Sequence, residues 1–252
     1  MNFAEKIFYN LGGTFLFLGQ VLKTSTHSLS KREEVFEQTL HVIYQSILTT
    51  AFAGFFVGAI MTLQFTLQVQ MFSALSFLGG LVTSATVREV GPLLIAFLLS
   101  GKIGAYTSAE LGTMKVSEQI DAIRCLGADP MKEVIVPRFI GIIIASFFLL
   151  IIGLICSFFG GILMATTFSG LPWEQYTTHI PTVMTQFSIL SGVVKCFVFS
   201  LVIATLCTYR GYSVVGGARE VGEGVVKAAT QTMISLVLAD WFSSFILERL
   251  IP

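Results

Sequence analysis

Five long apolar runs constrain the fold of this chain more than any other feature. They lie at about residues 45–68, 87–107, 138–167, 186–209 and 227–248, and each is close to or longer than the ~20 residues that an α-helix needs to cross a bilayer. Lipid offers no hydrogen-bond partners to exposed backbone groups, so such runs must be helical. Their continuous rather than alternating apolar character excludes a membrane β-barrel. The sequence therefore predicts an all-α integral membrane protein with five transmembrane helices.

Composition supports this class. The chain is 54% hydrophobic and only 12% charged, whereas soluble domains carry about 25% charged residues. Its fifteen basic and fifteen acidic residues cancel, so net charge indicates no nucleic-acid or acidic partner. The four cysteines have no C-x-x-C spacing and are interpreted as core residues rather than disulfides or metal ligands. The first residues lack the basic region and cleavage site of a signal peptide, so we expect them to be retained.

Lysine and arginine are unevenly distributed along the chain. Twelve of the fifteen lie in residues 1–44, in the region between the second and third runs, or in the loop between the fourth and fifth runs. Loops 69–86 and 168–185 contain none. The positive-inside rule then predicts a cytoplasmic N-terminus and a C-terminus on the opposite side.

Residues 1–30 differ from the five runs, because their apolar stretch is broken by glycines and followed by polar residues. This pattern favours an interfacial helix along the inner leaflet over a sixth span. A frayed leader is the alternative. We therefore expect one domain over 1–252, with an interfacial segment at 1–44 and a transmembrane core at 45–252.

Lys195 and Asp240 are ionisable residues inside apolar runs, where a charge is costly. Counted from the predicted inner ends of their helices, they lie at depths of roughly 21 Å and 18 Å at 1.5 Å per residue. The short loop between these helices makes them antiparallel neighbours, so we expect an intramembrane Lys195–Asp240 ion pair. Such a pair is either a device that fixes helix registry or a proton or ion relay.

Arg88 and Glu89 open the second predicted span, at about 28 Å from its inner end. An arginine there either binds a phosphate through its guanidinium fork or extends to the headgroup region. Pro92 predicts a kink one turn later. Gly54 and Gly58 in the first run, and a small-residue row in the second, predict close helix packing within or between protomers. That row is Ser100, Gly104, Ser108 and Gly112.

A charged segment, "ELGTMKVSEQIDAIRCLGADPMKE" at 110–133, separates two very apolar runs. Apolar residues at helical spacing and a polar opposite face predict a short amphipathic helix over 110–128. Gly127 suits a C-terminal cap, and Asp129-Pro130 suits the start of the next helix. The helix either docks onto a cytosolic partner or lies on the membrane surface. The predicted apolar stripe is Val116, Ile120, Ile123 and Leu126.

Sequence motifs of enzymes are absent. The chain has no G-x-x-x-x-G-K-[ST], no H-E-x-x-H and no G-x-S-x-G, and its three histidines stand alone. We therefore expect a non-catalytic protein with no cofactor or metal of its own.

The charged segment closely resembles the hallmark of MlaE-type (YrbE-like) permeases, E-[IL]-G-x-M-x-x-[ST]-E-Q-[IL]-[DS]-A-[IL] followed by D-P and P-R. The matching residues are Glu110, Gly112, Met114, Ser117, Glu118, Gln119, Asp121, Asp129, Pro130, Pro137 and Arg138. The likeness in span layout covers nearly the whole chain.

The resemblance implies the permease subunit of an ABC transporter that moves phospholipid or a related lipid between the bacterial cytoplasmic membrane and the outer envelope. Its implied partners are a second copy of the chain, two cytosolic ATPase subunits that bind ATP and Mg, an outer ring of MCE-domain lipid carriers, and a small cytosolic regulatory subunit. The C-terminus would then be periplasmic.

Residue roles follow from the same resemblance. Residues 110–128 match the coupling helix, with Glu110, Met114, Lys115, Glu118, Asp121 and Arg124 as the ATPase-coupling residues. The resemblance places a lipid cavity near the outer leaflet and matches its Arg-Glu pair to Arg88 and Glu89. The predicted lipid site also includes Gln64 and Leu67, at the outer end of the first run, where the polar Gln64 could line a cavity or bond a neighbouring helix. The intramembrane pair corresponds to Lys195 and Asp240. An ion-coupled secondary transporter with a Lys195–Asp240 relay and a non-transporting scaffold are the alternatives, and the former lacks the paired broken helices of many such folds.

Overall fold

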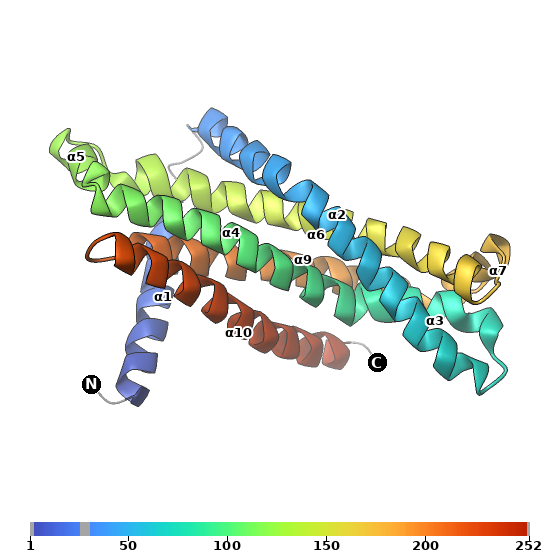
Figure 1. Ribbon diagram of the computed structural model, residues 1–252. Helices are drawn as coiled ribbons and strands as arrows, with labels where there is room; N and C mark the ends of the chain where they lie inside the picture. Colours follow the sequence, from blue (N-terminus) through green and yellow to red (C-terminus); the bar gives the residue numbers. More distant parts are fainter. Residues whose placement is uncertain (1–2, 26–30, 251–252) are drawn as a thin grey trace. The chain divides into compact units, whose positions relative to one another are not determined.

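The computed structural model describes residues 3–25 and 31–250, and every regular element in these ranges is helical (Figure 1). Five helical stretches are long and apolar enough to cross a membrane: 32–70, 75–116, 131–168, 186–212 and 218–249. The prediction of an all-α protein with five membrane-spanning segments is confirmed. Residues 26–30 of the predicted interfacial segment, including His27, lie outside the described residues.

The elements follow one another along the chain as Figure 1 labels them. An N-terminal helix α1 (Phe3–Ser25) precedes α2 (Arg32–Gln70), which contains the first span. The second span is composite: η2 (Leu75–Phe77), α3 (Leu78–Ala85), η3 (Thr86–Val90) and α4 (Gly91–Val116). The short α5 (Gln119–Cys125) leads into the third, η4 (Met131–Ile135) and α6 (Val136–Phe168). Two short helices, α7 (Trp173–Thr178) and α8 (Ile180–Val183), precede α9 (Gln186–Tyr212) and α10 (Ala218–Leu250).

These elements divide into two compact units. Unit 1 comprises Met1–Ile43, Ser100–Ala145 and Leu201–Ile234, and unit 2 comprises Tyr44–Leu99, Ser146–Ser200 and Ser235–Pro252. Each of α2, α4, α6, α9 and α10 contributes one segment to each unit. Twelve of the fifteen lysines and arginines belong to unit 1, and only Arg88, Lys195 and Arg249 belong to unit 2.

In unit 2, α2 and α6 cross so closely that glycine is required at the contact. A Cβ atom at Gly54 would lie 2.1 Å from the carbonyl oxygen of Gly153, and one at Gly58 would lie 1.8 Å from that of Ser157. No side chain fits at such distances, so the two backbones meet directly. The sequence is compatible with packing of this glycine pair within one protomer or between protomers. The structure shows that it packs within the chain.

In unit 1, α1 and the small-residue row of α4 both pack against α9. On α1, the Phe17 ring lies 5.5 Å from the Tyr209 ring, measured between centroids. On α4, a Cβ at Gly104 would lie 3.2 Å from the Cys207 sulfur, and the Ser108 hydroxyl donates to the Cys207 carbonyl at 3.2 Å. The small residues of α4 therefore allow close helix packing within unit 1.

The helical stretch that contains the second span starts earlier than the predicted span. The prediction begins at about residue 87, but helical structure begins at Leu75, so Arg88 and Glu89 lie inside this stretch rather than at its start. Gly79 and Gly80 lower the local hydropathy, so residues 75–86 are not part of the predicted span. These glycines allow α3 to pass close to α7: a Cβ at Gly79 would lie 1.9 Å from the carbonyl oxygen of Tyr176.

A small apolar core of unit 2 includes residues of α3 and α7, two helices that Figure 1 labels. Its buried members are Val69, Leu78, Val82, Ala165, Leu171 and Tyr176. Burial raises the pKa of the Tyr176 hydroxyl. The residue therefore stays neutral well into alkaline solution, as a buried tyrosine must.

Two π-helical turns occupy equivalent positions relative to proline. η3 and η4 are each five residues long, and each is followed by one residue and then a proline, Pro92 or Pro137. Proline lacks the N–H of a helical ladder and its ring crowds the carbonyl four residues back. A widened turn relieves that conflict, with the Gly91 N–H bonded to the Thr86 carbonyl and the Val136 N–H to that of Met131. The irregularity predicted at Pro92 thus takes the form of a π turn.

The charged segment 110–128 is not one helix. α4 continues to Val116, the backbone turns at Glu118 with φ 59°, and α5 then forms separately. The predicted stripe holds only in part, because Ile120 is fully buried while Leu126 is 86% exposed. The predicted caps are confirmed: Gly127 has φ 81°, and the Asp129 carboxylate accepts the Met131 N–H at 3.0 Å.

We expect Gly58→Ala to lower the free energy of unfolding by about 2 kcal/mol, because the added methyl forces α2 away from the α6 backbone. Thermal unfolding in detergent, followed by circular dichroism, measures this. Gly222→Ala in α10 is the control, since a Cβ there meets nothing within 4 Å. Equal melting temperatures for both variants would contradict a direct backbone contact at Gly58.

Candidate functional site

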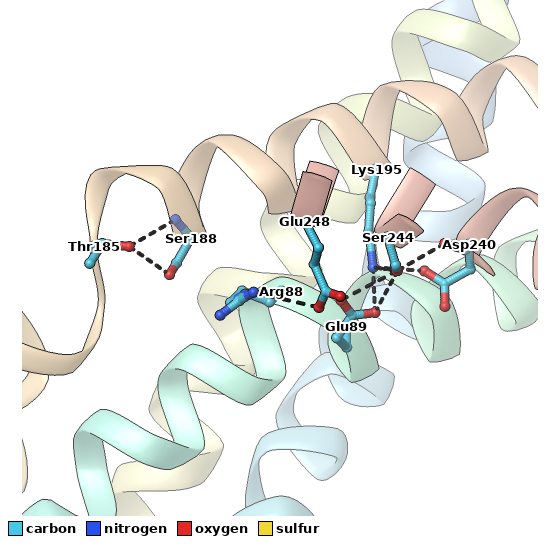
Figure 2. A network of polar contacts seen from close by, with 8 residues as sticks. All are labelled: Arg88, Glu89, Thr185, Ser188, Lys195, Asp240, Ser244 and Glu248. Carbon is cyan, nitrogen blue, oxygen red and sulfur yellow. Dashed lines mark hydrogen bonds and ion pairs between the residues drawn. The ribbon is translucent and has the colours of Figure 1, made fainter. Parts of the chain in front are cut away.

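A fully buried lysine lies at the centre of the charged cluster in unit 2. Lys195, on α9, has no exposed side-chain surface. Its ammonium nitrogen lies 3.0 Å from Asp240 Oδ1, donates to Ser244 Oγ at 2.7 Å, and donates to Glu89 Oε2 (Figure 2). An ammonium carries three donors and no acceptor; two of them bond Ser244 and Glu89, while Asp240 Oδ1 contributes an ion pair without a hydrogen bond. The desolvation cost of the lysine is offset only because all three contacts are made.

Ser244 connects the two acidic residues of this cluster. Its hydroxyl lies 3.1 Å from Glu89 Oε2 and 2.9 Å from the Asp240 backbone carbonyl. Because Ser244 follows Asp240 by four residues, both side chains lie on one face of α10. The network therefore joins three elements of unit 2, η3, α9 and α10.

The structure brings Lys195 and Asp240 together, and it adds Glu89 and Ser244, which sequence reasoning did not place there. Glu89 was missed because the second span was started too late, which put it at an outer helix end. Ser244 could have been found from its spacing to Asp240. With two carboxylates against one ammonium, the cluster is one charge more acidic than a simple pair.

Arg88 points away from this cluster although it precedes Glu89 in the chain (Figure 2). Its Nη2 atom lies 3.9 Å from Glu248 Oε1, and the two side chains are 35% and 65% exposed. Its Nε atom is buried and has no hydrogen-bond partner among the residues that the structure describes. Adjacent residues of a helical turn face different directions, so Arg88 and Glu89 enter different environments.

Arg88 lines a hollow of about 330 Å³ in unit 2. The lining residues are Phe65, Leu81, Ser84, Ala85, Arg88, Glu89, Val183 and Glu248. The hollow therefore combines apolar walls with one cationic and two anionic side chains. Of the predicted lipid-site residues, Arg88 and Glu89 line it, whereas Gln64 and Leu67 are exposed on α2 and do not. Phe65, between them, faces the hollow instead.

The predicted coupling residues of unit 1 form two groups. In the first, Asp121 is contacted by Lys115 at 3.2 Å and by Arg124 at 2.8 Å, and Arg124 also donates to the Tyr212 hydroxyl of α9 at 2.8 Å. These contacts fix α5 to the end of α4 and to α9.

The second group lies at the start of α6. Arg138 is almost buried, donates to Glu110 at 2.7 Å and lies 3.9 Å from the Met114 sulfur. Glu118 belongs to neither group and is exposed at the turn between α4 and α5. Nearby, Glu133 contacts Lys31 and raises the pKa of that ammonium. Unit 1 is therefore held by ion pairs on several of its helices.

Five membrane-spanning segments, a buried charged cluster and an adjacent hollow define a multi-spanning membrane protein of the transporter class. Residues 35–246 match the family model for the permease MlaE. The chain therefore belongs to the MlaE permease family, whose members are permeases of ABC transporters, and the resemblance seen in the charged segment is confirmed.

Similar proteins come from bacteria and from a plant. A probable ABC transporter permease of Rickettsia conorii is 32% identical over 82% of this chain and 80% of its own length. The intermembrane phospholipid transport system permease protein MlaE of Haemophilus influenzae is 30% identical over 84% of this chain and 80% of its own length. The chloroplastic protein TRIGALACTOSYLDIACYLGLYCEROL 1 of Arabidopsis thaliana is 30% identical over 77% of this chain and 55% of its own length.

We expect Lys195→Met to destabilise the protein by about 3 kcal/mol, the low end of the range for a buried pair, because the partly exposed carboxylates of Glu89 and Asp240 lose their shared cation. Adding Asp240→Asn alone should restore only part of the loss, since Glu89 remains charged, whereas adding Glu89→Gln as well should restore most of it. Melting temperatures in detergent measure the series. Lys227→Met, which removes an exposed cation paired with Glu223, is the control. Full rescue by Asp240→Asn alone would remove Glu89 from the network.

Proposed function

We propose that this chain is the permease of an ATP-driven transporter that moves phospholipid between the cytoplasmic membrane and the outer envelope. The hollow beside Arg88 carries this proposal, because it offers apolar walls and a guanidinium on one surface. A phospholipid has both parts that such a surface binds, acyl chains and a phosphate. The name of the Haemophilus relative, which specifies phospholipid transport, supports the same substrate.

The energy would come from other chains. This sequence has no P-loop, so we infer that two separate cytosolic ATPase subunits bind ATP and Mg and hydrolyse the nucleotide. The segment of α5 and its flanking turns is the proposed contact. Its Leu126 is 86% exposed at the end of α5, and contacts of Lys115 with Asp121 and of Arg124 with Tyr212 connect α5 to α4 and α9, the helices to which a push on α5 would pass.

Orientation and assembly complete the proposal. The concentration of lysine and arginine in unit 1 supports a cytoplasmic location for its loops, with the N-terminus inside and the C-terminus periplasmic. Helix α1 would lie along the inner leaflet, consistent with its exposed Phe15 and Leu16. We further propose a homodimer in a bacterial inner membrane, an outer ring of MCE-domain lipid carriers and a small cytosolic regulatory subunit. Within this assembly, residues 1–252 of each copy of the chain would act as one permease domain.

The Lys195 cluster supports a second candidate, an ion-coupled transporter that uses these carboxylates as a proton relay. The two candidates differ in their energy source. Lipid transfer in proteoliposomes that depends on ATP and continues in the presence of a protonophore would exclude the ion-coupled one.

Glu118→Arg and Leu126→Asp should each reduce capture of the ATPase by the tagged permease by about tenfold, because they alter exposed residues at the two ends of α5 without touching the Asp121 ion pairs. Co-purification in mild detergent measures the amount captured. Glu174→Arg, on α7 of unit 2, is the control. Undiminished capture by both variants would place the ATPase contact elsewhere.

Arg88→Glu should lower phospholipid occupancy of the purified transporter about tenfold, because it removes a charge-assisted phosphate contact and adds repulsion. Mass spectrometry of co-purified lipid measures occupancy. Arg249→Glu is the matched control, since Arg249 is also in unit 2 but packs over the Phe245 ring rather than lining the hollow. Equal occupancy in the two variants would exclude Arg88 from the lipid site.

A further inference from the structure

The three charged residues of the hollow are not equally available to a ligand. Glu89 is engaged on its inner side by Lys195 and Ser244. Asp240, which also contacts Lys195, is not among the lining residues. The Glu89 side chain is 40% exposed but already paired with Lys195, so the charges left for a ligand in the hollow to pair are chiefly those of Arg88 and Glu248.

Arg88 and Glu248 hold one another loosely. Their closest recorded approach is 3.9 Å, against 2.7 Å for Arg138 and Glu110 in unit 1. A pair at this distance with exposed side chains contributes little, because water screens it and no hydrogen bond fixes it. The buried Nε of Arg88 has no protein acceptor in the described part of the chain. A ligand can therefore replace this pair at small cost.

A zwitterionic phospholipid headgroup has the charges needed for such a replacement. Its phosphate accepts hydrogen bonds from a guanidinium, and its ammonium, a few bonds away, donates to a carboxylate. With Arg88 on the phosphate and Glu248 on the ammonium, both protein charges stay paired. An anionic headgroup without an amine would satisfy Arg88 but leave Glu248 facing a phosphate, which opposes binding.

We propose that Glu248 makes the hollow selective for phospholipids with a primary-amine headgroup, by binding the ammonium while Arg88 binds the phosphate. This inference rests on the proposed function, which requires a phospholipid in the hollow but does not require a particular headgroup. Glu248 was not among the predicted lipid-site residues. The sequence does not indicate that Glu248 lies near Arg88, because Glu248 lies in the last turns of α10, far along the chain from Arg88.

A competition experiment tests the selectivity. The complete transporter, purified and delipidated in detergent, is incubated with an equimolar mixture of dioleoyl phosphatidylethanolamine and dioleoyl phosphatidylglycerol, and bound lipid is quantified by mass spectrometry. The wild type should prefer phosphatidylethanolamine. Glu248→Gln, which keeps the size but removes the charge, should lower the ratio of bound ethanolamine to glycerol lipid about fivefold, as expected for loss of a partly exposed charged hydrogen bond. Glu248→Lys should reverse the preference.

Two further ligands sharpen the assignment. Phosphatidylcholine has a quaternary ammonium that cannot donate a hydrogen bond. It should therefore bind the wild type more weakly than phosphatidylethanolamine does, whereas the Glu248→Gln variant should bind the two lipids about equally. Soluble phosphoethanolamine should fail to displace bound lipid, because it lacks the acyl chains that the apolar walls contact. Displacement by millimolar phosphoethanolamine would show a site for the free headgroup and overturn the lipid assignment.

The outcomes separate the two proposals. If the wild type binds phospholipid but Glu248→Gln and Glu248→Lys keep its headgroup ratio, the selectivity inference is wrong while the lipid-transport proposal stands. If the wild type binds no phospholipid, the proposed function itself fails. Glu174→Gln, in unit 2 but away from the hollow, is the control and should keep the wild-type ratio.

Discussion

The arrangement of unit 2 depends on one interaction, the burial of the Lys195 ammonium against oxygens from η3 and α10. A lysine with no exposed surface is unstable unless nearby oxygens compensate its charge, so α9, α10 and the π turn at Glu89 must keep a defined registry. The orientation of Arg88 follows from this. Once Glu89 turns toward Lys195, its neighbour faces the hollow, where its partner is a distant and exposed carboxylate.

Backbone irregularities place these charges. The π turn before Pro92 inserts an additional residue into the helical repeat and thereby rotates the side chains that follow relative to those before it. Glycines then allow neighbouring backbones to approach, most closely where Gly54 and Gly58 meet α6. Lys195 and Asp240 therefore lie on regular helices, whereas Arg88 and Glu89 lie in the π turn itself, where the wider backbone determines which way their side chains point.

Sequence reasoning located several features of the site but not their connections. The intramembrane lysine and aspartate were evident because charges in apolar runs are costly, and their matched depths predicted their meeting. Glu89 was assigned to a helix end, since Gly79 and Gly80 interrupted the hydropathy of the second span. Gln64 and Leu67 do not line the hollow, whereas Phe65 between them does, and their place in the lipid site stays a prediction. One residue along a helix rotates the side chain by about 100°, so the face that a span turns to a cavity depends on packing.

The sequence by itself determined that the chain has five helical membrane-spanning segments, because water-free lipid permits no other use of long apolar runs. It also determined the family, through the motif at 110–138. Only the tertiary structure decided which charges share a network and which face the hollow. Those choices depend on distances between residues as far apart as Arg88 and Glu248, and on where π turns shift the helical register. Such contacts arise from packing, and no local pattern in the chain encodes them.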